Sequence, residues 1–271
     1  MRVAVVQLTS GDGVEDNLAR ASHWIGEAAE AGAELVALPE SFAYLAGESA
    51  GPNPSAQPLE GPVVGFLRDH AKRHGVVLAG GSFAEAIPGE ERVYNTSVVV
   101  DSEGRLLAVY RKLHLFDVDL PGVTLCESTH VAPGREVLTA QVGDWVLGLS
   151  ICYDLRFPEL YRELVAQGAT LLLVPSAFTI PTGRDHWEVL LRARAIESQC
   201  YVLAAAQVGE HAPGRASYGH SLIVDPWGEV LASLARDEGI AVAELDRDRL
   251  WEIRRNLPAL DHRRLGRSGP R

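Results

Sequence analysis

Cysteine is scarce in this 271-residue sequence, which contains three: Cys126, Cys152 and Cys200. An odd and sparse set argues against a disulfide framework. No two of the three have the spacing of metal ligands, and none belongs to a CxxC motif. The sequence is therefore typical of a reducing compartment, and we expect the protein in the cytoplasm.

Long apolar runs and excess positive charge are also missing. No uninterrupted apolar stretch reaches membrane-spanning length, and residues 2–8 form a short strand-like run rather than a signal peptide. Lys and Arg number 25 against 36 Asp and Glu, which gives a net charge of -11. An acidic protein is repelled by nucleic acid and by anionic membranes, so we expect neither as a partner. An anionic substrate would need a local cationic pocket.

Hydrophobic residues make up 46% of the chain, enough for a sizeable core. Strand-like and helix-like segments alternate, and hairpin turns interrupt the alternation, which predicts an α/β fold with mixed sheets. We expect strands at 2–8, 35–38, 76–80, 93–100, 105–111, 137–141, 145–151, 171–174, 201–206, 218–224, 229–235 and 239–245, and helices at 15–31, 62–74, 158–168, around 187–196 and at 246–256. No linker divides the chain, so we expect one domain over 1–271, with 257–271 as a tail.

Two predicted loops have the composition and length of functional segments. Residues 47–62 are rich in Gly, Pro, Ser and Asn and are expected to be exposed. Residues 112–135 are expected to be irregular, and a loop of that length inside a compact domain is usually functional.

Cys152 has the most suggestive position of the three cysteines. It follows the apolar run 145–151 and precedes a polar turn and a Pro-Glu pair, which indicates a strand, a tight bend and a helix start. A thiol there would face the positive end of a helix, which favours the thiolate. Cys152 is therefore the candidate nucleophile, whereas Cys126 and Cys200 are taken as structural.

Glu40 and Lys112 also follow predicted strands. Polar groups at the carboxyl ends of strands in α/β sheets face a common crevice. A thiolate, a proton-shuttling carboxylate and an ammonium that stabilises an oxyanion would together cleave an amide or a nitrile without a metal. Read singly, Glu40 is also consistent with a solvated carboxylate and Lys112 with a basic strand end.

The residue patterns alone leave the base undecided. Nine histidines keep a Cys–His hydrolase open, with His114, His130, His186 and His220 as the plausible partners. None of them has a diagnostic spacing. The patterns therefore support a thiol hydrolase without choosing its base.

Three segments occur in a revealing order: Leu38-Pro39-Glu40, Tyr110-Arg111-Lys112-Leu113-His114-Leu115 and Ile151-Cys152-Tyr153-Asp154-Leu155-Arg156-Phe157-Pro158-Glu159-Leu160. With them the chain resembles the nitrilase superfamily of carbon–nitrogen hydrolases along nearly its whole length. The resemblance implies an αββα sandwich with mixed sheets. It also implies a Glu–Lys–Cys triad, a homodimer and no metal or other cofactor.

The resemblance implies a role for each matching residue. Cys152 would be the nucleophile, Glu40 the general base, and Lys112 the oxyanion stabiliser and proton donor. Glu127 falls where the family has a further active-site glutamate. The backbone N–H of Tyr153 would be a second oxyanion donor.

Three further side chains are expected to bind the substrate. Arg156 lies four residues after the nucleophile and would supply the local positive charge, although a salt bridge at the helix entry would also explain it. Tyr44 and Phe178 would line the pocket. The Pro226-Trp227 turn and the C-terminal segment are candidates for the dimer interface.

The segments around the triad resemble the Nit-type amidase branch rather than true nitrilases, whose cysteine is followed by Trp-Glu. Residues 200–207 and 215–220 most resemble enzymes that act on deaminated glutathione. This implies cleavage of the side-chain amide of a small 2-oxo acid through a cysteine thioester, giving 2-oxoglutarate and cysteinylglycine. One alternative is an ω-amidase acting on 2-oxoglutaramate or 2-oxosuccinamate. The others are cleavage of a nitrile or N-carbamoyl group and a catalytically silent binding or scaffold protein of the same fold.

Overall fold

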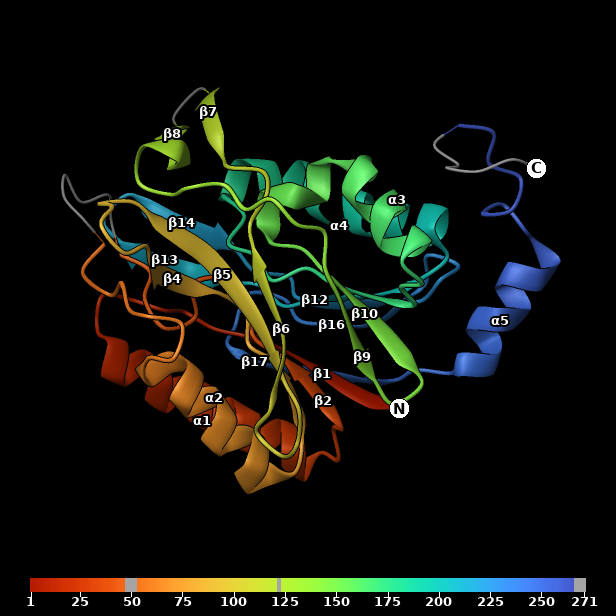
Figure 1. The fold of residues 1–271 in the computed structure, drawn as a ribbon, viewed down its shortest axis with the longest axis horizontal. Helices are drawn as coiled ribbons and strands as arrows, with labels where there is room; N and C mark the ends of the chain where they lie inside the picture. Colours follow the sequence, from red (N-terminus) through yellow and green to blue (C-terminus); the bar gives the residue numbers. More distant parts are fainter. Residues whose placement is uncertain (47–52, 121–122, 266–271) are drawn as a thin grey trace.

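The computed structural model describes residues 1–46, 53–120 and 123–265 (Figure 1). Residues 47–52 of the predicted exposed loop and residues 266–271 of the predicted tail lie outside the described residues. Within the described ranges, no helix is both long and apolar enough to cross a membrane.

Seven strands of the described chain form the first sheet, in the order β17-β1-β2-β3-β5-β4, with β6 also paired to β5. The three strands β1 to β3 are parallel, and the outer strands pair antiparallel. The strands are β1 (Arg2–Gln7), β2 (Leu35–Ala37), β3 (Val77–Ala79), β4 (Phe83–Ala86), β5 (Val93–Val100), β6 (Leu106–Arg111) and β17 (Gly239–Glu244).

Six further strands form the second sheet, in the order β16-β15-β12-β11-β10-β9 within the described chain. Its centre, β10 to β12, is again parallel, and its outer pairs are antiparallel. The strands are β9 (Thr139–Val142), β10 (Trp145–Leu149), β11 (Leu171–Leu173), β12 (Tyr201–Ala204), β15 (Leu222–Val224) and β16 (Val230–Ser233).

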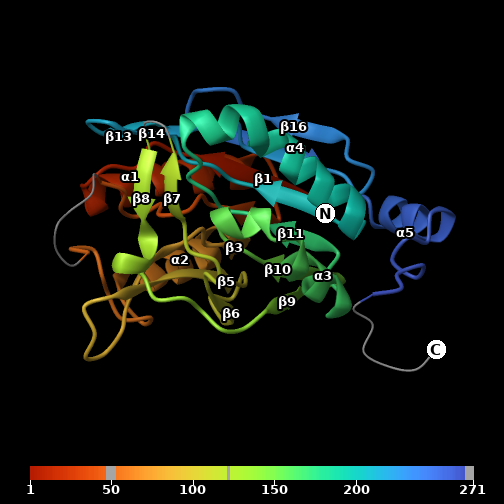
Figure 2. The same ribbon diagram turned by 90° about the horizontal axis from the view of Figure 1, so that it is seen from above.

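The two sheets lie face to face, and each carries a pair of helices on its outer face (Figures 1 and 2). Helices α1 (Val14–Glu30) and α2 (Pro62–His74) cover the first sheet, and α3 (Pro158–Ala166) and α4 (Ile180–Ser198) cover the second. Helix α5 (Arg247–Asn256) lies at the side of the sandwich. The predicted αββα sandwich with mixed sheets is confirmed.

The alternation of side chains along β1 explains the layering. Val3 and Val5 belong to the core between the sheets, whereas Ala4 and Val6 face α1 and α2. Both faces of the strand are therefore buried, and the sequence of such a strand is continuously apolar instead of alternating.

Two hairpins depart from the sequence-based prediction, and they lie at the same end of the molecule in both views (Figures 1 and 2). The segment 112–135, predicted to be irregular, contains β7 (Asp117–Leu120), β8 (Val123–Cys126) and the 3₁₀ helix η1 (Glu127–Thr129). The predicted strand 218–224 is also wrong in part. Consecutive positive φ angles at Gly219 (76°) and His220 (60°) separate β15 from a hairpin of β13 (Val208–Ala212) and β14 (Arg215–Tyr218).

Candidate active site

Glu40, Lys112 and Cys152 come together from both sheets. Glu40 lies in the turn after β2, Lys112 directly follows β6, and Cys152 begins the 3₁₀ helix η2 (Cys152–Arg156) after β10. The Lys112 side chain is 2% exposed, and its Nζ lies 3.2 Å from Oε1 of Glu40. Glu127, at the start of η1, accepts from the same ammonium at 3.0 and 2.9 Å. The structure therefore places the four predicted catalytic side chains in one cluster, in which Glu40 and Lys112 are buried and Glu127 and Cys152 are partly exposed.

The Lys112 ammonium is stabilised by two carboxylates. Burial opposes its charge, but Glu127 and Glu40 outweigh this effect and hold the pKa of Lys112 well above its usual value. Oε2 of Glu127 also accepts the backbone N–H of Phe116 at 2.6 Å, which fixes the carboxylate on the loop that follows Lys112. Lys112 is therefore a permanent positive charge at the centre of the site.

The surroundings of the Cys152 thiol favour its protonated form. Burial and the Glu40 carboxylate raise the pKa of Cys152 well above its usual value, and Lys112 offsets only part of this. The thiol also forms a hydrogen bond with Glu40, which favours the protonated form. Burial and the Glu40 carboxylate therefore oppose the thiolate that the helix start was expected to favour.

The backbone at Cys152 is strained and held by its neighbours. Its φ of 49° lies in the left-handed region, where a non-glycine residue costs roughly 1–3 kcal/mol. The Cys152 N–H donates to the Pro175 carbonyl at 2.9 Å. The neighbouring Ile151 N–H donates to Oδ2 of Asp154 at 2.9 Å. These contacts hold the thiol at the end of β10 despite the strain.

Asp154 joins this turn to the lysine loop. Its fully buried carboxylate accepts the Tyr110 hydroxyl at 2.7 Å, the His114 N–H at 3.0 Å and the His114 ring Nδ1 at 2.7 Å. The His114 ring stacks on Phe157 with centroids 3.7 Å apart. Asp154 therefore ties the thiol-bearing turn to the strand that carries Lys112.

The histidines hold other positions. The largest charged and hydrogen-bonding influences on the Cys152 pKa come from Glu40, Lys112 and the Ala177 backbone. His186 contacts Arg156, His220 contacts the Tyr218 carbonyl, and His130 caps η1. The geometry therefore favours Glu40 over a histidine as the partner of the thiol.

The structure shows two contacts to Glu40 that the sequence did not predict. The Ala177 N–H donates to Oε2 of Glu40 at 2.9 Å, and Nδ2 of Asn95 donates to Oε1 at 2.9 Å. Ala177 is a backbone donor and has no side-chain signal in a sequence. Asn95 lies within β5, and an isolated asparagine in a strand pattern gives no functional signal on its own.

The predicted substrate-binding residues Tyr44 and Phe178 lie in segments of the chain that follow Glu40 and Ala177. Tyr44 is half-buried and lies in the turn after Glu40, where its N–H donates to the Ser41 carbonyl at 3.1 Å. Phe178 follows Ala177 and packs against Trp187, with ring centroids 4.8 Å apart. Tyr153 is the second residue of η2, where backbone N–H groups have no partner within the helix.

Arg156 lies on an aromatic platform. Its guanidinium carbon is 5.4 Å from the Phe178 ring centroid and 5.8 Å from that of Tyr153, and its Nη1 is 3.3 Å from Nδ1 of His186. In the part of the chain that the structure describes, no carboxylate lies within ion-pair distance of Arg156. The helix-entry salt bridge is therefore not observed, and this cation has its charge available to a ligand.

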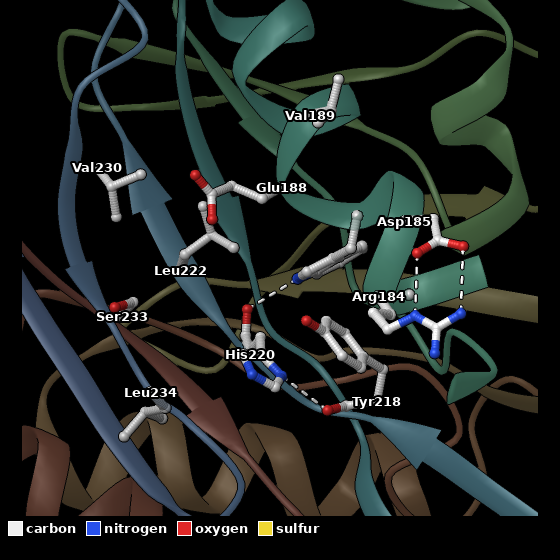
Figure 3. A pocket seen from close by; sticks show the side chains of 12 residues that line it. Arg184, Asp185, Glu188, Val189, Tyr218, His220, Leu222, Val230, Ser233 and Leu234 are labelled. Carbon is white, nitrogen blue, oxygen red and sulfur yellow. Dashed lines mark hydrogen bonds and ion pairs between the residues drawn. The ribbon is translucent and has the colours of Figure 1, made fainter. Parts of the chain in front are cut away.

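A separate hollow of about 150 Å³ lies between α4 and the strands β14 to β16 (Figure 3). Arg184 pairs with Asp185 at its edge, and Nε1 of Trp187 donates to the His220 carbonyl at 2.8 Å. Its lining includes none of the four clustered residues, so it is distinct from the cluster around Cys152. Across the described ranges, no group of three or more His, Cys, Asp or Glu side chains is arranged to hold a metal ion.

Comparison with known proteins gives matches over nearly the whole chain. Residues 2–255 match the carbon-nitrogen hydrolase family. Deaminated glutathione amidase of Synechocystis sp. is 46% identical over 264 residues, which cover 96% of this chain and 97% of that protein. The crystal structure of the C. elegans NitFhit protein superposes with a TM-score of 0.87 at 40% identity, covering 97% of this chain and 65% of that chain.

A third comparison concerns the reactive cysteine. A variant of the amidase from Nesterenkonia sp. AN1 is 29% identical, has a TM-score of 0.74 and covers 95% of this chain and 98% of its own. That structure records Michael addition of acrylamide at its active-site cysteine.

Proposed function

Because the chain belongs to the carbon–nitrogen hydrolase family, we propose that it cleaves an amide through a thioester on Cys152. The observation that carries the proposal is the cluster in which the buried Glu40 contacts both the thiol and Lys112. A base, a nucleophile and a fixed cation within hydrogen-bond reach are the parts that acyl transfer to a thiol requires.

In the first half of the reaction, Sγ of Cys152 bonds to the amide carbon as its proton moves to Glu40. The carbonyl oxygen becomes an oxyanion, stabilised by Nζ of Lys112 and the Tyr153 N–H. The C=O bond then re-forms and the C–N bond breaks. The leaving nitrogen takes up the proton that Glu40 had accepted. The raised pKa of Lys112 makes it a poor proton donor, so we assign proton delivery to Glu40 rather than to the lysine.

In the second half, water attacks the thioester carbon and loses a proton to Glu40. The C–S bond breaks, the acid product leaves, and the proton returns to the thiolate of Cys152. Glu127 keeps Lys112 charged and aimed throughout, through its two contacts at 3.0 and 2.9 Å.

We propose deaminated glutathione as the substrate, with 2-oxoglutarate and cysteinylglycine as products. The name of the 46% identical Synechocystis relative supports this choice. The substrate is anionic, and the cluster of two carboxylates and one ammonium would repel it. Arg156 supplies the missing positive charge and would bind a substrate carboxylate, with Phe178 and Tyr44 lining the pocket.

A small substrate panel tests the proposal. The purified protein is offered deaminated glutathione, 2-oxoglutaramate, an N-carbamoyl amino acid and a simple nitrile, with cysteinylglycine and ammonia measured separately. We expect cysteinylglycine release to be the fastest reaction. Faster ammonia release from 2-oxoglutaramate would favour the ω-amidase alternative.

The Cys152→Ala variant is the matched control. It should fold normally and form no acyl-enzyme detectable by mass spectrometry, and wild-type turnover in this variant would contradict the mechanism. If the wild-type protein turns over none of the panel and Cys152 is no more reactive than Cys126, the scaffold alternative gains.

We also propose that the protein is a homodimer. Val189, Ile196 and Trp227 are 67%, 48% and 57% exposed, and the turn after Trp227 is fixed on α4 because Arg192 donates to the Gly228 carbonyl at 2.8 Å. A second copy covering this face would remove the apolar groups from water. Light scattering should give twice the chain mass of 29.3 kDa, and Val189→Glu should lower it. A monomer mass for the wild type would contradict this.

Residues 1–271 are further proposed to form one domain, with 257–271 as a tail. Side chains of both sheets share one core, which supports a single cooperative unfolding transition as the expected result. All three cysteines are unpaired, which suits a reducing compartment such as the cytoplasm.

A further inference from the structure

The two carboxylate oxygens of Glu40 are not equivalent. Oε1 accepts two hydrogen bonds, from Nζ of Lys112 at 3.2 Å and from Nδ2 of Asn95 at 2.9 Å. Oε2 accepts one backbone hydrogen bond, from the Ala177 N–H at 2.9 Å. A carboxylate oxygen offers two lone-pair sites, so Oε1 is saturated and Oε2 retains one free site.

The orientation of the Asn95 amide is dictated by the two carboxylates. Its Nδ2 lies 2.9 Å from Oε1 of Glu40 and 3.5 Å from Oε1 of Glu127. A flipped amide would place its carbonyl oxygen against both negative charges. In the observed orientation the buried Oδ1 has no hydrogen-bond partner among the described residues. An unsatisfied buried acceptor costs free energy, and here the hydrogen bond from Nδ2 of Asn95 to Glu40 explains why the amide keeps this orientation.

Asn95 is also fixed to Lys112 through the backbone. Strands β5 and β6 pair antiparallel with Thr96 opposite Arg111, and beyond this pair the Lys112 N–H donates to the Asn95 carbonyl at 2.9 Å. Asn95 thus contacts the Lys112 backbone through its own backbone and Glu40 through its side chain, and so sets the distance between them.

We propose that Asn95 is a positioning residue that directs proton transfer from Cys152 to Oε2 of Glu40. With Lys112 it occupies both lone-pair sites of Oε1, and it stabilises the ionised form of the base. The inference rests on the proposed function in one respect, the role of Glu40 as the general base.

Asn95→Leu and Asn95→Asp test the proposal. Leucine is similar in size and cannot donate, whereas aspartate keeps the shape and adds a third carboxylate. We expect kcat to fall about 10- to 100-fold, part of the 10²–10⁴ that a positioned base contributes, with KM within about twofold. The acidic limb of the pH–rate profile should move to higher pH, further in Asn95→Asp, because the ionised base loses its donor or gains a like charge.

Thr96→Val is the matched control on the same strand. The Thr96 hydroxyl donates to Oε2 of the buried Glu85 at 2.7 Å, so this variant also removes one hydrogen bond to a buried carboxylate. We expect its kcat and its pH profile to equal those of the wild type. If kcat fell as much in Thr96→Val as in Asn95→Leu, Asn95 would only stabilise the strand, and the inference would be overturned.

A second measurement does not depend on the substrate. Alkylation of Cys152 by iodoacetamide, followed by mass spectrometry across pH, should be slower at neutral pH in both Asn95 variants, because Asn95 no longer orients Oε2 of Glu40 toward the thiol proton. If Asn95→Leu does not fold, the nearly isosteric Asn95→Asp carries the test. Wild-type alkylation and pH profiles in folded variants would overturn the inference. A wild-type protein that hydrolyses no amide would instead refute the proposed function.

Discussion

The peptide N–H of Ala177 donates to Oε2 of Glu40 over 2.9 Å, across 137 positions of sequence. Glu40 follows a strand of the first sheet and Ala177 follows β11 of the second. The carboxylate is therefore held from both halves of the sandwich. The proposed chemistry depends on how the sheets pack, and a substitution in the shared core can reduce activity without touching the site.

Removing the Lys112 ammonium should destabilise the protein as well as inactivate it. In Lys112→Leu the Glu40 and Glu127 carboxylates would lose the cation that separates them, and breaking a buried ion pair costs about 3–5 kcal/mol. Urea denaturation should report this loss in the free energy of unfolding. The double variant Lys112→Leu/Glu127→Gln should recover part of the stability and none of the activity. Equal stability of the two variants would contradict this account.

Replacing Arg156 should weaken substrate binding selectively. A hydrogen bond to a charged group contributes about 1.5–3 kcal/mol, so Arg156→Met should raise KM about 10- to 150-fold for a substrate with a carboxylate. Steady-state kinetics with deaminated glutathione and with a neutral amide analogue would show the difference. Arg184→Met, which removes an exposed arginine paired with Asp185, is the control and should leave KM unchanged.

Stability should fall steadily above pH 9. Burial raises the pKa of Cys200 from 9.0 to about 11 and that of Tyr201 from 10.0 to about 12. Below pH 9 these groups are protonated in both states. At higher pH the unfolded chain releases its protons first, and each group lowers the unfolding free energy by about 1.4 kcal/mol per pH unit until the folded group titrates.

Cys200→Ala isolates one of these contributions. Between pH 9 and pH 11, unfolding of Cys200→Ala should release about one proton fewer than unfolding of the wild type. The free energy of unfolding of the variant should therefore fall by about 3 kcal/mol less over these two pH units. Cys126→Ala, which removes an exposed thiol, is the control variant. Parallel slopes for the wild type and Cys200→Ala would contradict the prediction.

Local patterns predicted an α/β fold with mixed sheets and the strand-end positions of the candidate residues, whereas the αββα layers and the assignment of the triad came from the resemblance. Buried parallel strands appear as continuous apolar runs. Glu40 follows such a strand in the first sheet and Cys152 follows one in the second, and the packing of the two sheets brings them together. The β7–β8 hairpin was missed because its two strands have only four residues each, although β7 alternates polar and apolar residues.

The contacts to Glu40 and the charge state of the thiol depend on tertiary structure. Ala177 acts through its backbone, and Asn95 matters because pairing of β5 with β6 places it beside Lys112. The sequence suggests a thiolate at Cys152 from one nearby lysine and a helix start. Burial and the Glu40 carboxylate oppose that expectation, and both depend on the packed structure.

The pairing of β1 with β17 also bears on how the chain is made. Residues 239–244 occupy the edge of the first sheet beside residues 2–7, so that sheet cannot be completed until nearly the whole polypeptide has left the ribosome. Until then β1 presents unpaired backbone groups along an apolar edge, the arrangement that promotes self-association of nascent chains. A truncation upstream of Gly239 should therefore yield insoluble protein rather than a smaller enzyme.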